Sequence, residues 1–403
     1  MKAYYGTIKR CLWTILLIMT VQFGGQLRIP GVQSTELKSV NILNYFTNLS
    51  AGKISELTFF SLGLSPYMLA LVLWSTLSML DIDVIKHLSE KHSGIIRRIL
   101  IFSFCLLQAI GTVFRFKDRI IYSDYPQLST MLVNIFFVII LITGGMIVSY
   151  IAEVNTRKGI GKQMVIILPG LMANIPAMLL SGQEGGGLFT TAKGLMILLI
   201  VTVVFLYISV FLYKSEYRIV VQQTGLDISF KKSYIPIKVI PAGALPFMFG
   251  VTLFSLPQLL VNVKSLHGTT FLYLITRLFS YGTVPGIITY ALILIILGYG
   301  FSHVNVRVYD IAKSLRDSGD YIFDVIPGQD TENYIRKKLN NMIILNNFYM
   351  VGVSVIPLVI GLKISGVTNL AFYFGSLFMI IVIIDSLHED IRFMLAKRQY
   401  KLF

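Results

Sequence analysis

The chain has 403 residues, of which 55% are hydrophobic and 14% are charged, and its 35 lysines and arginines outnumber its 20 aspartates and glutamates to give a net charge of +15. An ordinary soluble domain carries about 25% charged residues, so the composition excludes that class and indicates a membrane protein. The two cysteines, Cys11 and Cys105, both fall inside apolar runs, so no disulfide framework is predicted.

Ten apolar runs are candidates to cross a bilayer as helices, which takes about 20 residues. They cover roughly residues 10–26, 62–80, 99–114, 130–150, 163–181, 194–213, 240–261, 283–303, 341–361 and 365–384. The first run follows Lys2, Lys9 and Arg10 but lacks the small-residue cleavage site of a signal peptide. We therefore expect a retained first helix, in an all-α membrane protein with ten transmembrane helices.

The distribution of basic residues predicts the orientation of these helices, because cytoplasmic loops hold the excess of lysine and arginine. With the N-terminus inside, the segments on the cytoplasmic side carry 25 of the 35 basic residues. Both termini are therefore predicted to be cytoplasmic, in a multi-pass protein of the plasma membrane.

The segment between the first two runs, residues 39–60, has apolar residues at helical spacing but is too polar to span a membrane. We expect a short helix that either folds back into the outer side or lies at the interface. The ten runs divide into two halves of five, residues 1–181 and 182–403. Because each half has an odd number of spans, the second half is predicted to be inverted relative to the first.

The second and seventh runs open with proline-containing segments, LGLSPYMLA (62–70) and PAGALPFMFG (241–250). A proline inside a helix removes a backbone donor, and irregular backbone at membrane depth is tolerated only inside protein or beside a water-filled cavity. The two segments occupy corresponding positions of the two halves. They are predicted to face each other across a pathway, with ordinary proline kinks as the alternative.

Two long basic segments, residues 214–238 and 304–340, lie on the predicted cytoplasmic side. They are interpreted either as solvated loops or as a docking surface for a soluble partner. The apolar runs themselves contain no charged residue or histidine away from their edges, whereas ion-coupled transporters keep such groups. We find no metal-ligand spacing, nucleophile with a base, or nucleotide motif. The sequence therefore predicts no enzyme activity, cofactor or nucleic-acid partner, and any energy must come from a partner.

Five segments resemble, in order, the signature segments of the SecY family of protein-conducting channels. They are LGLSPYMLA (62–70), TRKGIGKQMVIILPGLMANIP (156–176), PIKVIPAGALPFMFG (236–250), IPGQDTENYI (326–335) and QYKLF (399–403). Their order along nearly the whole chain is more specific than any one of them. The resemblance implies a ten-helix clamshell in which a lateral gate opens between the second and seventh spans, beside a polypeptide pore.

The resemblance also implies roles for individual residues. The apolar pore ring is placed at Leu64, Met68, Val72, Ile167, Leu171, Met248 and Phe378, with Met379 as the alternative to Phe378. The lateral gate is placed at Pro66, Gln108, Ile240, Pro241, Gly243 and Pro246, and docking of the motor at Ile326, Pro327, Gly328, Arg336, Lys337 and Lys338. Residues 39–60 resemble the plug. For each pore residue, plain packing between helices is the alternative interpretation.

Three departures from the general SecY pattern resemble the accessory SecY of some Gram-positive bacteria. The family's arginine before Pro327 is Ile326 here, its asparagine in the seventh span is Ile240, and its glycine-rich motif has become residues 159–163. This resemblance implies export of serine-rich glycoproteins driven by an accessory SecA-type ATPase. Other implied partners are small SecE- or SecG-like subunits, accessory Sec proteins, the secreted polypeptide and membrane lipids. A housekeeping SecY and a small-solute secondary transporter are the alternatives.

Overall fold

A computed structural model describes residues 2–32, 57–79, 89–117, 120–122, 129–180, 192–222, 233–260, 270–363 and 368–399. Most of the plug-like segment predicted at 39–60 lies outside these residues, as do the last four residues of the QYKLF motif. Only Leu57, Thr58, Phe59 and Phe60 of that segment are described, and they pack as buried or partly buried residues beside α6.

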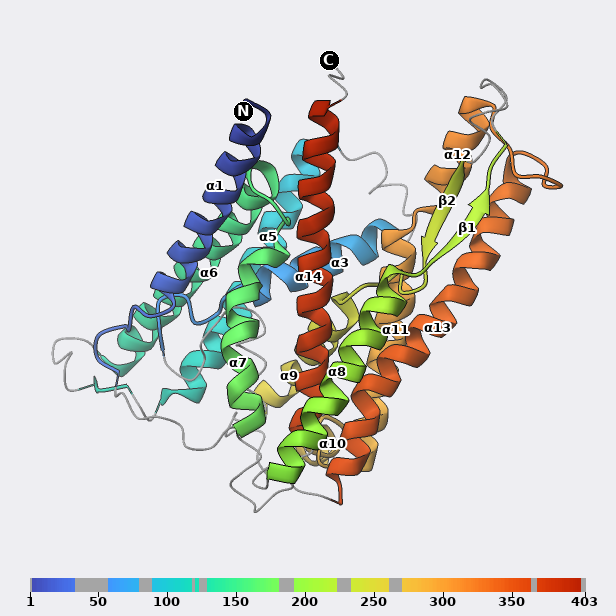
Figure 1. The fold of residues 1–403 in the computed structure, drawn as a ribbon. Coiled ribbons are helices and arrows are strands. Elements are labelled where there is room, and N and C mark those ends of the chain that lie inside the picture. Colours follow the sequence, from blue (N-terminus) through green and yellow to red (C-terminus); the bar gives the residue numbers. More distant parts are fainter. Residues whose placement is uncertain are drawn as a thin grey trace.

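The described chain is mostly helical, and a helix lies over each of the ten predicted apolar runs (Figure 1). These helices are α1 (Lys2–Gly24), α3 (Ser65–Met79), α5 (Glu90–Arg115), α6 (Thr130–Lys158), α7 (Leu168–Leu180) with the short helix η3 (Met164–Ile167) before it, α8 (Ala192–Lys214), α9 (Leu245–Leu260), α11 (Val284–Asn305), α13 (Gln329–Gly361) and α14 (Thr368–Gln399). Two further helices are α10 (Thr270–Leu278) and α12 (Val308–Ser318).

Six helical segments are long and apolar enough to cross a membrane, judged by length and composition within the described residues. They are Lys91–Phe114, Thr130–Lys158, Lys193–Lys214, Val284–Ser318, Gln329–Gly361 and Thr368–Ala396. Helices α3, α7 and α9 have 15, 13 and 16 described residues, and each ends at the last residue of a described range.

Helix α14 lies at the centre of the molecule, with α1, α5 and α6 on one side of it and α8, α11 and α13 on the other (Figure 1). It contacts α1, α7, α8, α9 and α13. In the most apolar part of α14, 56% of the residues are buried, against 11% in the most apolar part of α8. A helix that is apolar all round is expected to be buried in protein or in lipid. Thus α14 forms the core, and α8 exposes its apolar side chains at the rim.

The prolines at the predicted breaks lie at or just before helix starts and not inside the helices. Pro66 and Pro246 are the second residues of α3 and α9. The N–H of a residue in the first turn has no partner within its helix, so a proline there removes nothing. Pro241 lies before α9, which begins at Leu245 instead of near the predicted residue 240.

The two long basic segments are structured, which corrects their description as loops. Strands β1 (Glu216–Val220) and β2 (Tyr234–Lys238) form an antiparallel hairpin in which Glu216 pairs with Lys238. The second segment holds α12 and the first turns of α13, which begins at residue 329 and not near 341. We call residues 215–222, 233–239 and 306–343 the head.

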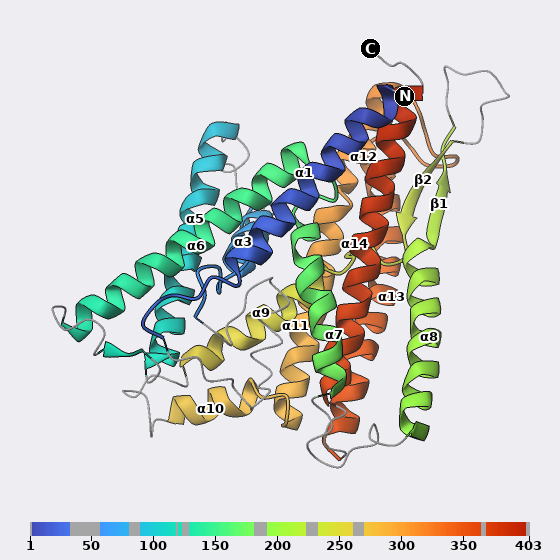
Figure 2. The same ribbon diagram turned by 60° about the vertical axis from the view of Figure 1, so that its left-hand side comes forward.

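The head has its own hydrophobic core, separate from that of the helix bundle. The main chains of Gln222 and Tyr321 exchange two hydrogen bonds of 2.8 and 3.1 Å, which join the two basic segments. The head lies at the same end of the bundle as both termini (Figures 1 and 2). Its buried core consists of Ile219, Ile237, Val308, Ile322, Ile335, Leu339 and Ile343.

Candidate channel site

The turns that precede α3 and α9 have the same local structure. Gly63 and Gly243 have φ angles of +54° and +61°, a conformation that glycine adopts without steric cost. Each glycine lies two residues before the first residue of its helix and three residues before a proline. The equivalent residues are 180 positions apart in the chain, one in each predicted half.

The first backbone hydrogen bonds of the two helices also correspond. The N–H of Met68 donates to the carbonyl of Leu64 at 3.0 Å, and the N–H of Met248 donates to that of Ala244 at 3.4 Å. Helices α3 and α9 contact each other. The structure therefore brings together the two segments that the sequence predicted to face each other.

Polar contacts from neighbouring helices fix the two turns at the predicted gate. The buried amide Nε2 of Gln108 in α5 donates to Oγ of Ser65 at the start of α3 over 3.0 Å. In the second half, Nδ2 of Asn305 at the end of α11 donates to the carbonyl of Pro241 over 2.9 Å. The starts of the two helices at the predicted gate are thus bonded to neighbouring helices, α3 to α5 and the turn before α9 to α11.

The remaining residues of the predicted gate are mostly buried. Ile240 is 1% exposed, and Pro66, Pro241 and Pro246 are buried. A Cβ atom added at Gly243 would meet Val382 of α14 at 3.8 Å, an ordinary contact. The turn before α9 is therefore held by its backbone conformation and by its neighbours on α11 and α14.

The described residues of the predicted pore ring all lie in one buried cluster in the middle of the bundle. The side chain of Val72 is outside the described part of the chain. The cluster also holds residues such as Tyr290 that the resemblance does not place in a pore, so the ring remains a prediction. The ring residues in the cluster are Leu64, Met68, Ile167, Leu171, Met248 and Phe378, together with the alternative Met379.

Phe378 has the densest aromatic surroundings of the predicted ring residues. Its ring lies 5.7 Å from that of Phe247, 5.5 Å from that of Tyr349 and 6.2 Å from that of Tyr213, all in edge contacts. These partners come from α9, α13 and α8. Since aromatic pairs add packing energy beyond their buried area, Phe378 helps to hold α14 against α8, α9 and α13.

The predicted docking residues lie together on the head, around the start of α13. Ile326 is 71% exposed and Pro327 is also exposed, while Gly328 is the N-cap of α13 with a φ of +118°. The three cations further along lie on a helix and not in a loop.

These three cations have different surroundings. Arg336 is exposed and pairs with Glu332 one turn earlier, and Lys337 is exposed. The ammonium of Lys338 lies 5.1 and 5.5 Å from the ring centres of Tyr217 and Tyr334, a geometry that favours a cation. Arg336 and Lys337 are therefore available to a partner, whereas Lys338 helps to attach β1 to α13.

A second set of charges connects the head and the adjoining end of α8 to α14. Nζ of Lys238 donates to Glu389 at 3.0 Å, and Lys214 lies 3.8 Å from Asp385. Burial lowers the pKa of Lys238, but Tyr213 and the hydrogen bond to Glu389 outweigh it and raise that pKa above its ordinary value. Lys238 therefore stays charged, and α14 carries an ionic contact with the base of the hairpin.

A buried polar junction near the same end of the bundle was missed from the sequence. Oγ1 of Thr14 in α1 donates to Oδ1 of Asn155 in α6 at 2.9 Å and accepts from the N–H of Ile160 at 2.9 Å. Nδ2 of Asn155 donates to the carbonyls of Ile160 and Lys162. Thr14 and Asn155 are polar residues inside two apolar helices, and this is the sequence signal that could have predicted the junction.

The same junction reaches the second half of the chain. The N–H of Gly161 donates to Oδ2 of Asp390 in α14 at 2.9 Å. Gly161 and Lys162 both have positive φ angles, +73° and +54°, and a Cβ at Gly161 would collide with the side chain of Val165. Residues 159–163 thus form a compressed turn that joins α1, α6 and α14.

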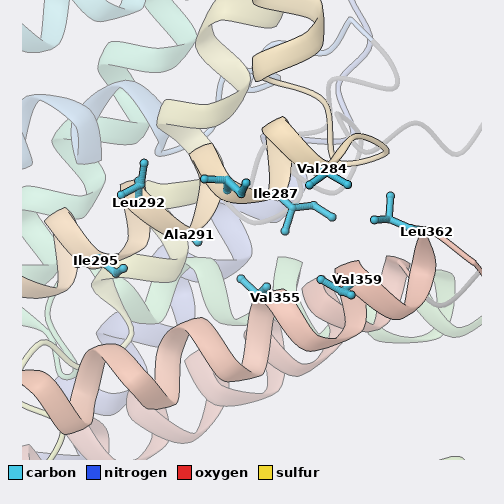
Figure 3. Close-up of a pocket in the computed structure, with 9 residues that line it drawn as sticks. Val284, Ile287, Ala291, Leu292, Ile295, Val355, Val359 and Leu362 are labelled. Carbon is cyan, nitrogen blue, oxygen red and sulfur yellow. The ribbon is translucent and has the colours of Figure 1, made fainter.

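An apolar groove of about 360 Å³ lies between α11 and α13 (Figure 3). Its walls include Ile287, Ala291 and Leu292 from α11 and Val355 and Val359 from α13, without a charged side chain. It opens at the rim of the bundle, where several of these residues are exposed. Among the described residues there is no group of three His, Cys, Asp or Glu side chains able to hold a metal ion.

Comparison with known proteins identifies the family. The model of the SecY family matches residues 58–387. The accessory Sec system protein translocase subunit SecY2 of Streptococcus salivarius is 27% identical over 404 residues, which cover 98% of this chain and 97% of that protein. Its counterpart in Streptococcus gordonii is 28% identical over 370 residues, 89% of each chain.

Solved structures show the same fold. The chain described as "The structure of a protein conducting channel" has a TM-score of 0.68 at 14% identity and covers 98% of this chain and 94% of its own. Sec61 of the canine ribosome–channel complex has a TM-score of 0.62 at 14% identity, with the same coverage. Since the family model spans most of the sequence and the fold agrees, the chain belongs to the SecY family.

Proposed function

We propose that the chain is the protein-conducting channel of an accessory Sec system and exports polypeptides across the plasma membrane. The observation that carries this function is the full-length similarity to relatives named as accessory Sec translocase subunits, together with membership of the SecY family. The departures at Ile240 and Ile326 from the general SecY pattern favour the accessory type.

The proposed architecture is a clamshell of ten transmembrane helices in two inverted halves, residues 1–181 and 182–403. Two observations support it. A helix lies over each of the ten apolar runs, and the glycine-containing turn before α3 recurs before α9 at an offset of 180 residues. In this architecture both termini and the head are cytoplasmic, which agrees with their position at one end of the bundle (Figure 1).

The proposed pathway runs through the cluster that contains Met68, Leu171 and Met248. An apolar constriction offers a passing chain no hydrogen bonds that would hold it, and it resists wetting, so ions are blocked at rest. Methionine side chains adapt to varied shapes. The lateral gate is the contact between α3 and α9, where opening would separate two helices and leave their internal hydrogen bonds intact.

The proposed energy source is a SecA-type ATPase, the accessory SecA, that docks on the head. The exposed Ile326, Arg336 and Lys337 support this surface, because an apolar side chain beside cations suits an acidic and partly apolar partner. Serine-rich glycoproteins are the proposed substrate class. Small SecE- or SecG-like subunits are proposed to cover the rim.

The experiment that tests this function is purification of the tagged chain from its native membrane after mild cross-linking, with the retained proteins identified by mass spectrometry. An accessory SecA together with accessory Sec proteins is the expected result. Retention of the housekeeping SecA alone would assign the chain to the general pathway, and retention of no ATPase would contradict a motor-driven channel.

A further inference from the structure

Helix α10 differs in direction from the helices around it. It lies at the end of the bundle opposite the termini, where α8 and α11 begin, and it runs across the direction of α8 and α14 (Figure 2). It contacts α9 and α11 and comes directly before the turn that leads into α11. Helix α10 thus lies along one end of the bundle and does not cross the bundle.

Hydrogen bonds in the turn after α10 fix its orientation. Oγ1 of Thr283, the N-cap of α11, donates to the carbonyl of Arg277 in the last turn of α10 at 2.7 Å. The same oxygen accepts from the N–H of Gly286 in the first turn of α11 at 3.2 Å. A Cβ atom at Gly286 would collide with the carbonyl of Ser280, so the turn is tight. Helices α10 and α11 therefore hold a defined angle to each other.

An aromatic cluster connects α10 and this turn to α9, a helix of the predicted gate. The ring centre of Phe254 in α9 lies 4.2 Å from that of Tyr281 and 5.4 Å from that of Phe279. Tyr281 also lies 5.3 Å from Tyr290 of α11, and Ile275 of α10 is buried. Aromatic pairs at these distances are attractive beyond their buried area. Helices α9, α10 and α11 thus pack as one unit at this end of the bundle.

The exposed side of α10 combines apolar and basic side chains. Tyr273 and Leu274 are 66% and 53% exposed, and Arg277 is exposed four and three residues after them, so all three lie on one side of the helix. Arg277 has no ion-pair partner within the described residues. Water disfavours the leucine and the tyrosine ring, and hydrocarbon disfavours the arginine. This side of α10 suits the boundary between water and hydrocarbon, where tyrosine and arginine are both favoured.

We propose that α10 is an interfacial anchor that lies in the surface of the outer leaflet of the membrane. Tyr273 and Leu274 reach the boundary between headgroups and acyl chains, and the guanidinium of Arg277 lies at the level of the lipid phosphates. Through the contact of Phe254 with the turn after α10, the membrane surface holds the gate helix α9 at a fixed depth. The choice of the outer leaflet rests on the proposed topology, whereas the interfacial position rests on α10 itself.

Quenching of tryptophan fluorescence in proteoliposomes of the full-length chain tests the position of α10. The two native tryptophans, Trp13 and Trp74, are replaced by phenylalanine, and Tyr273→Trp supplies a single reporter. Lipids brominated near the headgroup end of the acyl chain should quench it at least about twofold more than lipids brominated near the methyl end, as expected at an interface, and aqueous iodide should quench it weakly. Stronger quenching from the methyl end, quenching by iodide alone, or quenching by none of these agents would place the reporter in hydrocarbon, in water or under protein, and each would overturn the proposal.

Matched reporters and a charge substitution complete the test. In the same background, Tyr309→Trp on the head, 62% exposed, should respond to iodide alone, and Tyr207→Trp within α8, 74% exposed, should respond most to bromine near the methyl end. With the Tyr273→Trp reporter, Leu274→Asp should reduce quenching by bromine near the headgroups at least about twofold, because a carboxylate leaves the apolar boundary for water. Phe323→Asp on the head, 77% exposed, should leave that quenching unchanged. An equal reduction in both variants, or none in Leu274→Asp, would contradict the anchor.

Discussion

At the scale of single residues, Met248 tests the proposed pore ring, because it is 8% exposed in the cluster that also holds Met68 and Leu64. If it belongs to a closed apolar collar, Met248→Asn should allow the collar to hydrate and should raise the resting ion conductance. If Met248 only packs between helices, an amide without partners should lower stability by about 1–3 kcal/mol and leave conductance unchanged. Planar-bilayer recording on protein matched for folded amount distinguishes the two.

A matched control for this substitution exists in the same hydrophobic core. Met350 of α13 is 0% exposed and is not assigned to the ring. Met350→Asn should therefore lower thermal stability without creating conductance. Equal conductance in both variants would mean that any buried amide makes the bundle leak, and the ring assignment of Met248 would then fail.

Gly243 tests the turn before α9. Its φ of +61° is costly for a residue with a Cβ atom, while the space around that Cβ is open enough for an ordinary contact. We expect Gly243→Ala to lower the free energy of unfolding by about 1–2 kcal/mol through backbone strain alone. Gly300→Ala in α11 has nothing within 4 Å of its Cβ and should be neutral or stabilising. Denaturant unfolding in detergent measures both.

At the scale of elements, the junction of α1 and α6 depends on Asn155, which is fully buried and contacts Thr14 and the turn at 160–162. Asn155→Ala would leave these partners unsatisfied, and each costs about 1–3 kcal/mol. We expect a total loss of at least about 2 kcal/mol. Thr156→Ala, next to it on the exposed face, should change stability by less than about 0.5 kcal/mol. A similar loss in both variants would contradict the role given to Asn155.

The head should dock the motor through Arg336 and Lys337. Arg336→Glu/Lys337→Glu should weaken binding of the ATPase and make the remaining binding less sensitive to salt, because exposed ion pairs are screened. Lys338→Glu should instead destabilise the head, since Lys338 lies over Tyr217 and Tyr334. Binding measured at several salt concentrations checks this, with Lys9→Glu/Arg10→Glu as control. Unchanged affinity and salt dependence would exclude these two residues.

The sequence predicted the helices better than their ends. Apolar runs identify membrane helices because lipid requires every backbone group to be bonded internally, and a helix lies over each run. The apolar run at 341–361 could not show that α13 begins at residue 329, because the first turns of α13 have polar residues on their exposed side. Their buried residues Thr331, Ile335, Leu339 and Ile343 recur every four positions, so helical periodicity was the usable signal.

The sequence indicated where the chain turns before α3 and α9, but not the contacts that hold the turns. Glycine and proline at the starts of α3 and α9 indicated where the chain turns, and the family resemblance is confirmed. The hydrogen bond from Gly161 to Asp390 joins residues 229 positions apart, and no local pattern encodes such a contact. Sequence patterns indicate each residue's preference for a helix, strand or turn, whereas this contact depends on how three helices pack.

At the scale of the whole molecule, both termini and the head lie at one end of the bundle. The property to test is the orientation of this end relative to the membrane. Helix α12 lies at the end that carries the termini, whereas α13 runs to the opposite end (Figure 1), and Asp317 in α12 and Lys363 after α13 are both exposed. In intact cells, an impermeant thiol reagent should label Lys363→Cys and should not label Asp317→Cys, because the segments predicted to be cytoplasmic, which include Asp317, carry 25 of the 35 basic residues. The opposite labelling would reverse the topology.

The burial of the turns before α3 and α9 has a consequence for the electrostatics of the interior. The first N–H groups of a helix have no partner within the helix, and the start of a helix carries a partial positive charge. Ser65 is 5% exposed and Pro246 is buried, so the starts of α3 and α9 bring two partial positive charges into the interior of the bundle. An anionic group is therefore accommodated there more readily than a cationic one.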